Sequence, residues 1–107
     1  MLESRLNVLR QLQAEVERDE NRHVPLIVGN VRGVTEVRFV ALRENDNALV
    51  VERCDRRLAF IPLDFVCTSW REQRPHGTLH RVRVTRFGWR RVIGLPAIAA
   101  ERTTRVG

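Results

Sequence analysis

The chain has 107 residues and a formal net charge of +6, and all 19 of its Lys and Arg residues are arginine. This length is typical of one domain, and a hydrophobic share of 43% is sufficient for a packed core. No run approaches the roughly 18 apolar residues that a membrane-spanning helix needs, which excludes a helical membrane protein.

The first residues predict an amphipathic helix over 1–20. Apolar side chains recur there at steps of three and four, which places them on one stripe of a helix: Leu2, Leu6, Leu9, Leu12 and Val16. We expect this stripe to lie against an apolar surface. If the rest of the chain cannot cover it, the stripe would mark an interface with a partner or a second copy.

After the helix, short β-rich runs alternate with turn residues. We expect six strands, over residues 23–28, 34–42, 48–53, 58–63, 66–71 and 78–87. The predicted fold is mainly β, with the N-terminal amphipathic helix followed by a small, strongly bent antiparallel barrel or sandwich of about six strands within 21–100. Residues 89–93 could form a seventh strand, 95–100 a short helix or an edge strand, and 101–107 a flexible tail.

Several residues predict local geometry. Pro25 cannot donate to a strand ladder, so its strand must begin there or lie at an edge. Residues 45–47, Asn-Asp-Asn, favour a tight hairpin with a left-handed residue. Between Leu63 and Val66 there is room only for a single tight or 3₁₀ turn through Asp64 and Phe65.

Two further expectations concern faces and loops. Alternation places Val37, Phe39 and Ala41 together on one face of their strand. Residues 72–77 contain proline and glycine, which predicts a surface loop.

The stretch from Leu58 to Val66 resembles the small β-barrels of the Sm-like and SH3-like kind. In those folds, a strand that ends in an Ile-Pro-Leu-Asp type of sequence, as at 61–64 here, passes through a 3₁₀ turn into the last barrel strand. The chain continues through further strands, so the resemblance implies a fold for about residues 1–71 and transfers no RNA-contact residue.

A second resemblance is to the N-terminal split-barrel domain of bacterial flagellar-brake proteins. It is carried by the helix sequence at 8–12 and by Leu-Pro-Ala at 95–97. The cyclic-dinucleotide site of that family lies mainly in an Arg-rich linker and a following PilZ domain, so the resemblance implies only the interaction half.

The positive charge belongs to the second half of the chain. Residues 1–55 hold 8 Arg and 10 acidic residues, whereas residues 56–107 hold 11 Arg and 3 acidic residues. Such a field attracts polyanions, namely RNA, DNA or an acidic protein surface. The alternative is that the arginines only solvate the exterior.

Residues 80–91 combine arginines with aromatic rings. On a strand, the alternating positions 80–85 divide into two faces: Arg81, Arg83 and Thr85 on one, His80, Val82 and Val84 on the other. Guanidinium groups bind phosphate, and exposed rings at Phe87 and Trp89 would stack on unpaired bases. The alternative is that both rings belong to the core.

We therefore predict a nucleic-acid-binding surface, with RNA expected ahead of DNA. Its candidate residues are Arg71, Arg74, Arg81, Arg83, Arg86, Trp89, Arg90 and Arg91. The alternative function is a protein-interaction or regulatory adaptor, or a self-associating module, that uses the helix or an open sheet edge.

Metal binding and catalysis have little support. His76, His80, Cys54 and Cys67 could supply zinc ligands, but the C-x₂₋₄-C spacing is missing, so no metal or cofactor is expected. The chain has no Gly-x-Ser-x-Gly and no Walker or dinucleotide loop, so we expect a protein that is not an enzyme.

The N-terminus lacks the basic and apolar regions of a secretory signal, which favours the cytoplasm. The two cysteines are then expected to be reduced, small core residues, and the histidines to be loop or surface residues.

Overall fold

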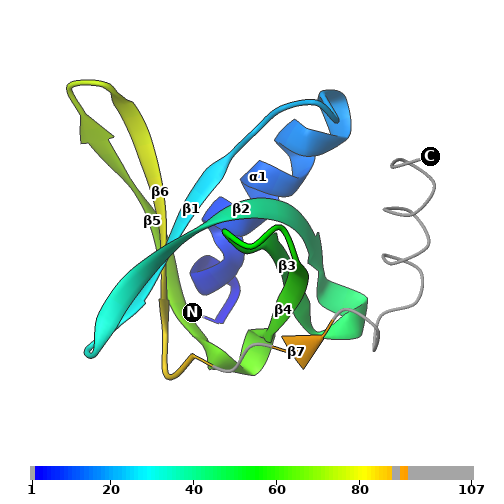
Figure 1. The fold of residues 1–107 in the computed structure, drawn as a ribbon, viewed down its shortest axis with the longest axis vertical. Helices are drawn as coiled ribbons and strands as arrows, with labels where there is room; N and C mark the ends of the chain where they lie inside the picture. Colours follow the sequence, from blue (N-terminus) through cyan, green and yellow to red (C-terminus); the bar gives the residue numbers. More distant parts are fainter. Residues whose placement is uncertain (1, 88–89, 92–107) are drawn as a thin grey trace.

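The computed structural model describes residues 2–87 and 90–91 (Figure 1). Its elements follow one another in this order: η1 (Leu2–Leu6), α1 (Asn7–Arg18), β1 (Pro25–Asn30), β2 (Gly33–Arg43), η2 (Glu44–Asp46), β3 (Ala48–Glu52), β4 (Leu58–Pro62), η3 (Leu63–Phe65), β5 (Val66–Arg74), β6 (Gly77–Val84) and β7 (Arg90–Arg91). The fold is mainly β with one N-terminal α-helix, which confirms the predicted class.

The strands form one bent sheet in the order β5-β6-β1-β2-β3-β4-β7, and this sheet is not closed. Six strands have five to eleven residues, and β7 has two. All pairs are antiparallel except β1 with β6, which is parallel. The prediction missed this pair because it depends on how the β5–β6 hairpin returns to β1, a long-range event that local patterns do not report.

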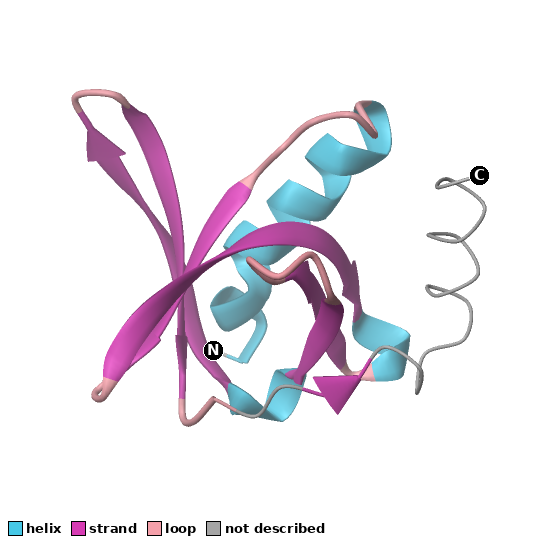
Figure 2. Ribbon diagram, in the orientation of Figure 1, coloured by secondary structure: helices cyan, strands magenta, loops and turns pink. Residues whose placement is uncertain are grey.

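The core lies between α1 and the inner side of the sheet, where Figure 2 shows the helix beside the curved strands. From the helix, Leu6, Leu9 and Leu12 are buried, and Val16 packs against the same cluster. The buried residues that follow the helix in this cluster are Val24, Leu26, Val28, Val37, Phe39, Leu42, Leu49, Val51, Ile61, Leu63, Val66, Val82 and Val84. The described part of the helix stripe is therefore covered by the chain itself, and this part of the argument for an adaptor is lost.

A β-bulge in β2 changes which side chains enter the core. The register to β3 shifts between Phe39 and Ala41, so Leu42 joins the core and Ala41 does not. The prediction that Ala41 shares the face of Val37 and Phe39 is wrong, because an extra residue in a strand reverses the alternation beyond it. A second apolar cluster forms instead: Ala48 and Val50, with Val40, Ala41, Leu58 and Phe60 against them.

Three predictions of local backbone geometry are confirmed. Pro25 is the first residue of β1. Asn47 ends the tight turn before β3 in the left-handed region, with φ of 54°. Leu63–Phe65 forms the single 3₁₀ turn that leads from β4 into β5.

The N-terminal segment is tied to this turn by its polar groups. The Arg5 guanidinium donates through Nη1 to the carbonyl oxygens of Leu63, at 2.7 Å, and Val66, at 3.1 Å. Ser69 Oγ donates to the carbonyl oxygen of Arg5 at 2.7 Å. The start of β5 is thereby fixed against the segment that precedes the helix.

The predicted loop at 72–77 is wrong. Strand pairing continues to Arg74 opposite Gly77, so only Pro75 and His76 form the turn. Gly77, with φ of 131°, has a backbone conformation that L side chains rarely adopt. The polar residues at 72–74 conceal a strand because this part of β5 extends the hairpin at the sheet edge (Figure 1), where neither face needs apolar side chains.

The expectations for cysteines and histidines are wrong in part. Cys54 and Cys67 are free thiols, but both are exposed rather than in the core. Cys67 lies where the β5 register shifts between Val66 and Thr68, and Cys54 lies in the turn after β3. Conversely, His80 is 9% exposed instead of lying on the surface, because it occupies a core-facing position of β6.

Part of the C-terminal prediction is described. The backbone of Arg90 and Arg91 forms β7 and pairs with Phe60 and Ala59 of β4. The rest of the predicted strand at 89–93, the apolar segment 95–100 and the tail 101–107 lie outside the described residues. Within residues 2–87 and 90–91, the helices are too short and polar to cross a lipid bilayer.

Candidate nucleic-acid interface

The alternation predicted for β6 is confirmed. His80, Val82 and Val84 are buried towards the core. Arg81 is half-buried and Arg83 is exposed on the opposite side. The two arginines therefore share the side of the sheet that faces away from α1.

Strand register determines which residues join them. Arg81 lies opposite Trp70 of β5 and Ile27 of β1, and Arg83 lies opposite Thr68 and Gly29. Since side chains alternate along a strand, Glu72 and Arg74 follow Trp70 on the same side. We call this set the outer face: Thr68, Trp70, Glu72, Arg74, Arg81, Arg83, Ile27 and Gly29.

Four side chains of the outer face contact one another. The Arg81 guanidinium lies 5.8 Å from the centroid of the Trp70 ring, within the range of a cation–π interaction. Trp70 Nε1 donates to Glu72 Oε1 at 3.0 Å, and Arg81 Nη1 donates to the same oxygen at 3.2 Å. The other oxygen, Oε2, accepts a hydrogen bond from Arg74 Nη2 at 2.5 Å. The indole and both guanidinium groups are thus oriented around one carboxylate.

This arrangement favours the ionised form of Glu72. The hydrogen bond from Trp70, followed by that from Arg74, lowers the pKa of the Glu72 carboxyl, and the charges of Arg81 and Arg74 act in the same direction. The outer face therefore has an oriented arrangement of positive groups at neutral pH, with one negative charge among them.

Arg83 differs from its neighbours because no ion pair holds it within the described part of the chain. Beside it, Gly29 has no side chain, and a Cβ there would come within 2.7 Å of Val34 Cγ1. The Val34 side chain therefore fills the space over Gly29, while Arg83 itself is exposed, which leaves its guanidinium accessible to a ligand.

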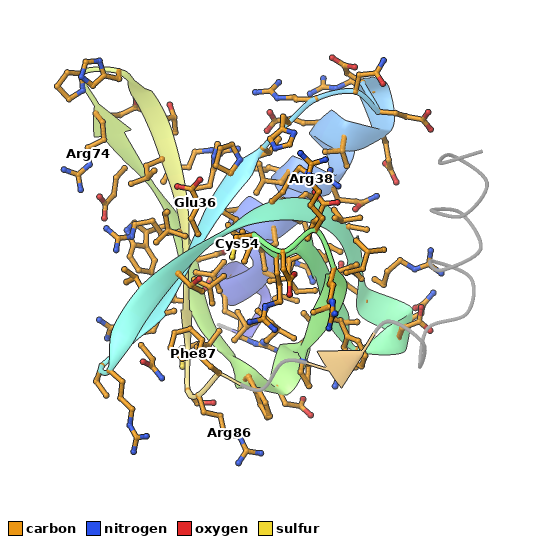
Figure 3. The ribbon with its side chains drawn as sticks, viewed as in Figure 1. Glu36, Arg38, Cys54, Arg74, Arg86 and Phe87 are labelled. Carbon is orange, nitrogen blue, oxygen red and sulfur yellow. The ribbon has the colours of Figure 1, made fainter. Side chains whose placement is uncertain are left out.

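The hairpin continues past β6 to Arg86 and Phe87. The Arg86 guanidinium lies 4.6 Å from the centroid of the Phe65 ring, and Phe87 is 36% exposed. In Figure 3, Arg74 lies at one end of the hairpin and Arg86 and Phe87 lie at the other. Arg74 lies opposite Gly77, six positions before Arg83, so at about 3.4 Å per residue Arg74, Arg81 and Arg83 span about 20 Å along the hairpin, with Arg86 beyond its end.

Arg71 does not belong to this face. Arg71 lies opposite His80 in the strand register, on the helix side of β5. Its guanidinium donates to Gln11 Oε1 and, at 3.3 Å, to Glu15 Oε2. Its place in the predicted surface is wrong, because neighbouring residues of a strand point to opposite sides.

The remaining predicted residues are placed only in part. Arg90 and Arg91 lie in β7, which is at the other end of the strand order from β5, so pairing does not bring them beside β6. Trp89 lies outside the described residues. The structure therefore brings together Arg74, Arg81 and Arg83, with Arg86 at the end of the hairpin.

Trp70 was missed by the sequence prediction, although it is the aromatic group at the centre of the outer face. The signal that could have found it is the set Thr, Trp, Glu and Arg at the alternate positions 68, 70, 72 and 74, which share one side of a strand. This set is recognised only if the strand continues beyond its predicted end at residue 71.

Apart from the outer face, the sheet has a hollow beside β1, β2 and the turn after β3. It is an open pocket of ≈ 300 Å³, lined by His23, Pro25, Glu36, Val37, Arg38, Glu52, Arg53, Cys54 and Arg56. Arg38 and Glu52 form a mostly buried ion pair there, with Nε and Oε1 2.9 Å apart, and Figure 3 shows Arg38 near Glu36 and Cys54. The lining mixes both charges, so it favours no particular ligand class. Among the residues that the structure describes, no group of three or more His, Cys, Asp or Glu could hold a metal ion.

Comparisons with protein-family models, curated proteins and solved structures give no match to this chain. Function is therefore inferred from the residues of the outer face.

Proposed function

We propose that the protein is a cytoplasmic, non-catalytic module that binds single-stranded nucleic acid, RNA ahead of DNA, through the outer face of β5 and β6. The observation that carries this proposal is the contact between Trp70 and Arg81, with Arg74 and Arg83 on the same side of the same hairpin. An aromatic ring among guanidinium groups supplies both interactions that a single strand offers.

Each group has a defined role in this proposal. The half-buried Trp70 ring provides a surface on which an unpaired base stacks, and stacking of this kind contributes about 1 to 3 kcal/mol per base. Arg81 and Arg83 donate to phosphate oxygens, which position the strand without reading its sequence. A duplex hides the faces of its bases, so the aromatic group favours unpaired strands, which RNA loops and ends present.

The charge of the hairpin supports the same conclusion. Arg74, Arg81 and Arg83 follow one another along about 20 Å of the hairpin with Arg86 beyond its end, and Glu72 is the one acidic residue between Val66 and Phe87. Phosphates of one strand could therefore meet several guanidinium groups in succession. Binding would then depend strongly on salt, because each neutralised phosphate releases counterions.

One observation favours an adaptor instead, namely that β5 lies at the end of the strand order, with β6 as its one strand neighbour among the described residues. A partner strand could add to such an edge. However, the distal half of β5 carries charged residues, which oppose edge-to-edge pairing. We therefore place this function second.

Fluorescence anisotropy tests the proposal. The protein is titrated into labelled single-stranded RNA, single-stranded DNA and duplex DNA at several salt concentrations. We expect micromolar or tighter binding to the single strands, RNA first, with a log-log salt slope of about 3 for three or four phosphate contacts. Absence of binding at low salt would refute the proposal and favour a protein partner.

A further inference from the structure

Glu72 is the one acidic side chain in the outer face as defined above. Its position is unexpected for a surface that binds phosphate, because a carboxylate there repels the ligand. Yet this carboxylate lies at the centre of the oriented group, between Trp70, Arg74 and Arg81.

The bonding pattern of Glu72 is that of an anion in a binding site. Its oxygen Oε1 accepts hydrogen bonds from Trp70 Nε1 and Arg81 Nη1, and its oxygen Oε2 accepts one from Arg74 Nη2. Guanidinium groups arranged in this way around two oxygens hold carboxylate and phosphate alike. The neighbouring Arg83 has no such partner among the described residues.

We propose that Glu72 is an intramolecular competitor, whose carboxylate occupies the position of a nucleic-acid phosphate and must be displaced when the strand binds. The inference rests on the proposed function and concerns the regulation and selectivity of the same surface.

Such a competitor selects for the length of the ligand. A single phosphate at Arg74 and Arg81 only replaces an anion that is already bound, so it gains little. A strand with several phosphates also reaches Arg83 and stacks a base on Trp70, and these additional contacts drive the displacement. The outer face should therefore reject mononucleotides and inorganic phosphate while it binds oligonucleotides.

The test compares three variants in the anisotropy assay. Glu72→Gln removes the charge but keeps an oxygen that can accept from Trp70. Glu72→Asp keeps the charge but shortens the side chain by one methylene, so the carboxylate no longer reaches both arginines. Glu36→Gln is the matched control, because Glu36 is an exposed carboxylate on β2, opposite Ile27 of the outer face, with no hydrogen bond or ion pair in the described part of the chain.

We expect Glu72→Gln to bind a single-stranded oligonucleotide about 5- to 10-fold more tightly than wild type. Its salt slope should rise by about 1, since a phosphate then neutralises a guanidinium that Glu72 held before. Glu72→Asp should bind more tightly too, by about 2- to 3-fold, although its charge is unchanged. Glu36→Gln should show only the smaller, general effect of one charge. Circular dichroism confirms that each variant is folded.

The outcomes separate the inference from the proposed function. If wild type binds but Glu72→Gln equals Glu36→Gln, the competitor is refuted and the nucleic-acid function stands. Weaker binding by Glu72→Gln would mean that the carboxylate orients the arginines for the ligand, and this too overturns the inference. If neither wild type nor Glu72→Gln binds at low salt, the proposed function itself fails.

Discussion

The two sides of the β5–β6 hairpin use arginine differently. On the inner side, Arg71 reaches across to α1, where Gln11 and Glu15 accept its hydrogen bonds. On the outer side, the hydrogen bonds that Arg74 and Arg81 make within the described residues go to Glu72, in their own hairpin. An arginine whose partners come from another element holds the fold together. An arginine whose partner lies on the same strand pair can release it without moving any element of the fold.

The largest expected effect on nucleic-acid binding comes from replacing Trp70 on the outer side. Replacing Trp70 by Leu removes the stacking surface but keeps an apolar side chain, so we expect binding of single-stranded RNA to fall by about 1 to 3 kcal/mol. Trp70→Phe, which retains a ring, should lose clearly less. The dissociation constants are measured by anisotropy, and equal losses in both variants would show that no base stacks there.

The second effect concerns the salt dependence. The double variant Arg81→Ala, Arg83→Ala should lower the log-log salt slope by about 2, because each guanidinium is expected to neutralise one phosphate. Its control is Arg18→Ala with Arg57→Ala, which removes two exposed arginines from the end of α1 and the turn before β4. A slope that falls equally in both pairs would mean that only net charge matters.

A smaller effect is expected on the inner side. Arg71→Gln should lower the free energy of unfolding by about 0.5 to 1 kcal/mol, the contribution of a partly exposed ion pair. The salt slope of nucleic-acid binding should stay as in wild type, because Arg71 faces the helix. Urea denaturation and anisotropy check the two parts, and a lower slope would place Arg71 back in the binding surface.

The smallest effect is a pH dependence of stability. Burial, and then the charge of Arg71, lowers the pKa of His80 below its ordinary value of 6.5, with Arg22 acting in the same direction and Glu15 against it. Below about pH 6.5 the unfolded chain binds this proton more readily than the folded protein, so stability should decline as the pH falls through the folded-state pKa.

Urea denaturation between pH 7.5 and 5 measures this decline. His80→Gln should remove it, whereas His76→Gln, at the exposed turn of the hairpin, should leave it unchanged. The lowered pKa of Glu44, caused mainly by its hydrogen bond to Arg10, acts only below about pH 4.5 and so does not overlap.

Much of the fold could be predicted because it follows from local chemistry. The spacing of leucines predicted the helix, Pro25 the start of β1, and Asn47 a left-handed turn residue. Alternation predicted the two faces of β6, because that strand has no irregularity between His80 and Val84.

The centre of the candidate site could not be predicted in the same way, because it depends on a bulge. The β5 register shifts between Val66 and Thr68, which places Val66 and Ser69 both towards the core and turns Trp70 outwards. Simple alternation from Val66 would put Trp70 inside. The contacts that accompany the bulge are the pairing with β6 and the hydrogen bond from Ser69 to Arg5, whose residues are far apart in the sequence, so local patterns do not report them.

The bonds between Arg5 and the start of β5 also determine when the protein can finish folding. The acceptors of the Arg5 guanidinium are 58 and 61 positions away, and the Ser69 donor is 64 positions away. During synthesis, the N-terminal segment therefore leaves the ribosome long before the partners of Arg5 exist. Residues of β1 and β2 can cover part of its apolar stripe earlier, but the bonds of Arg5 must wait until β5 has emerged. Contacts over such long sequence separation slow the last step of folding.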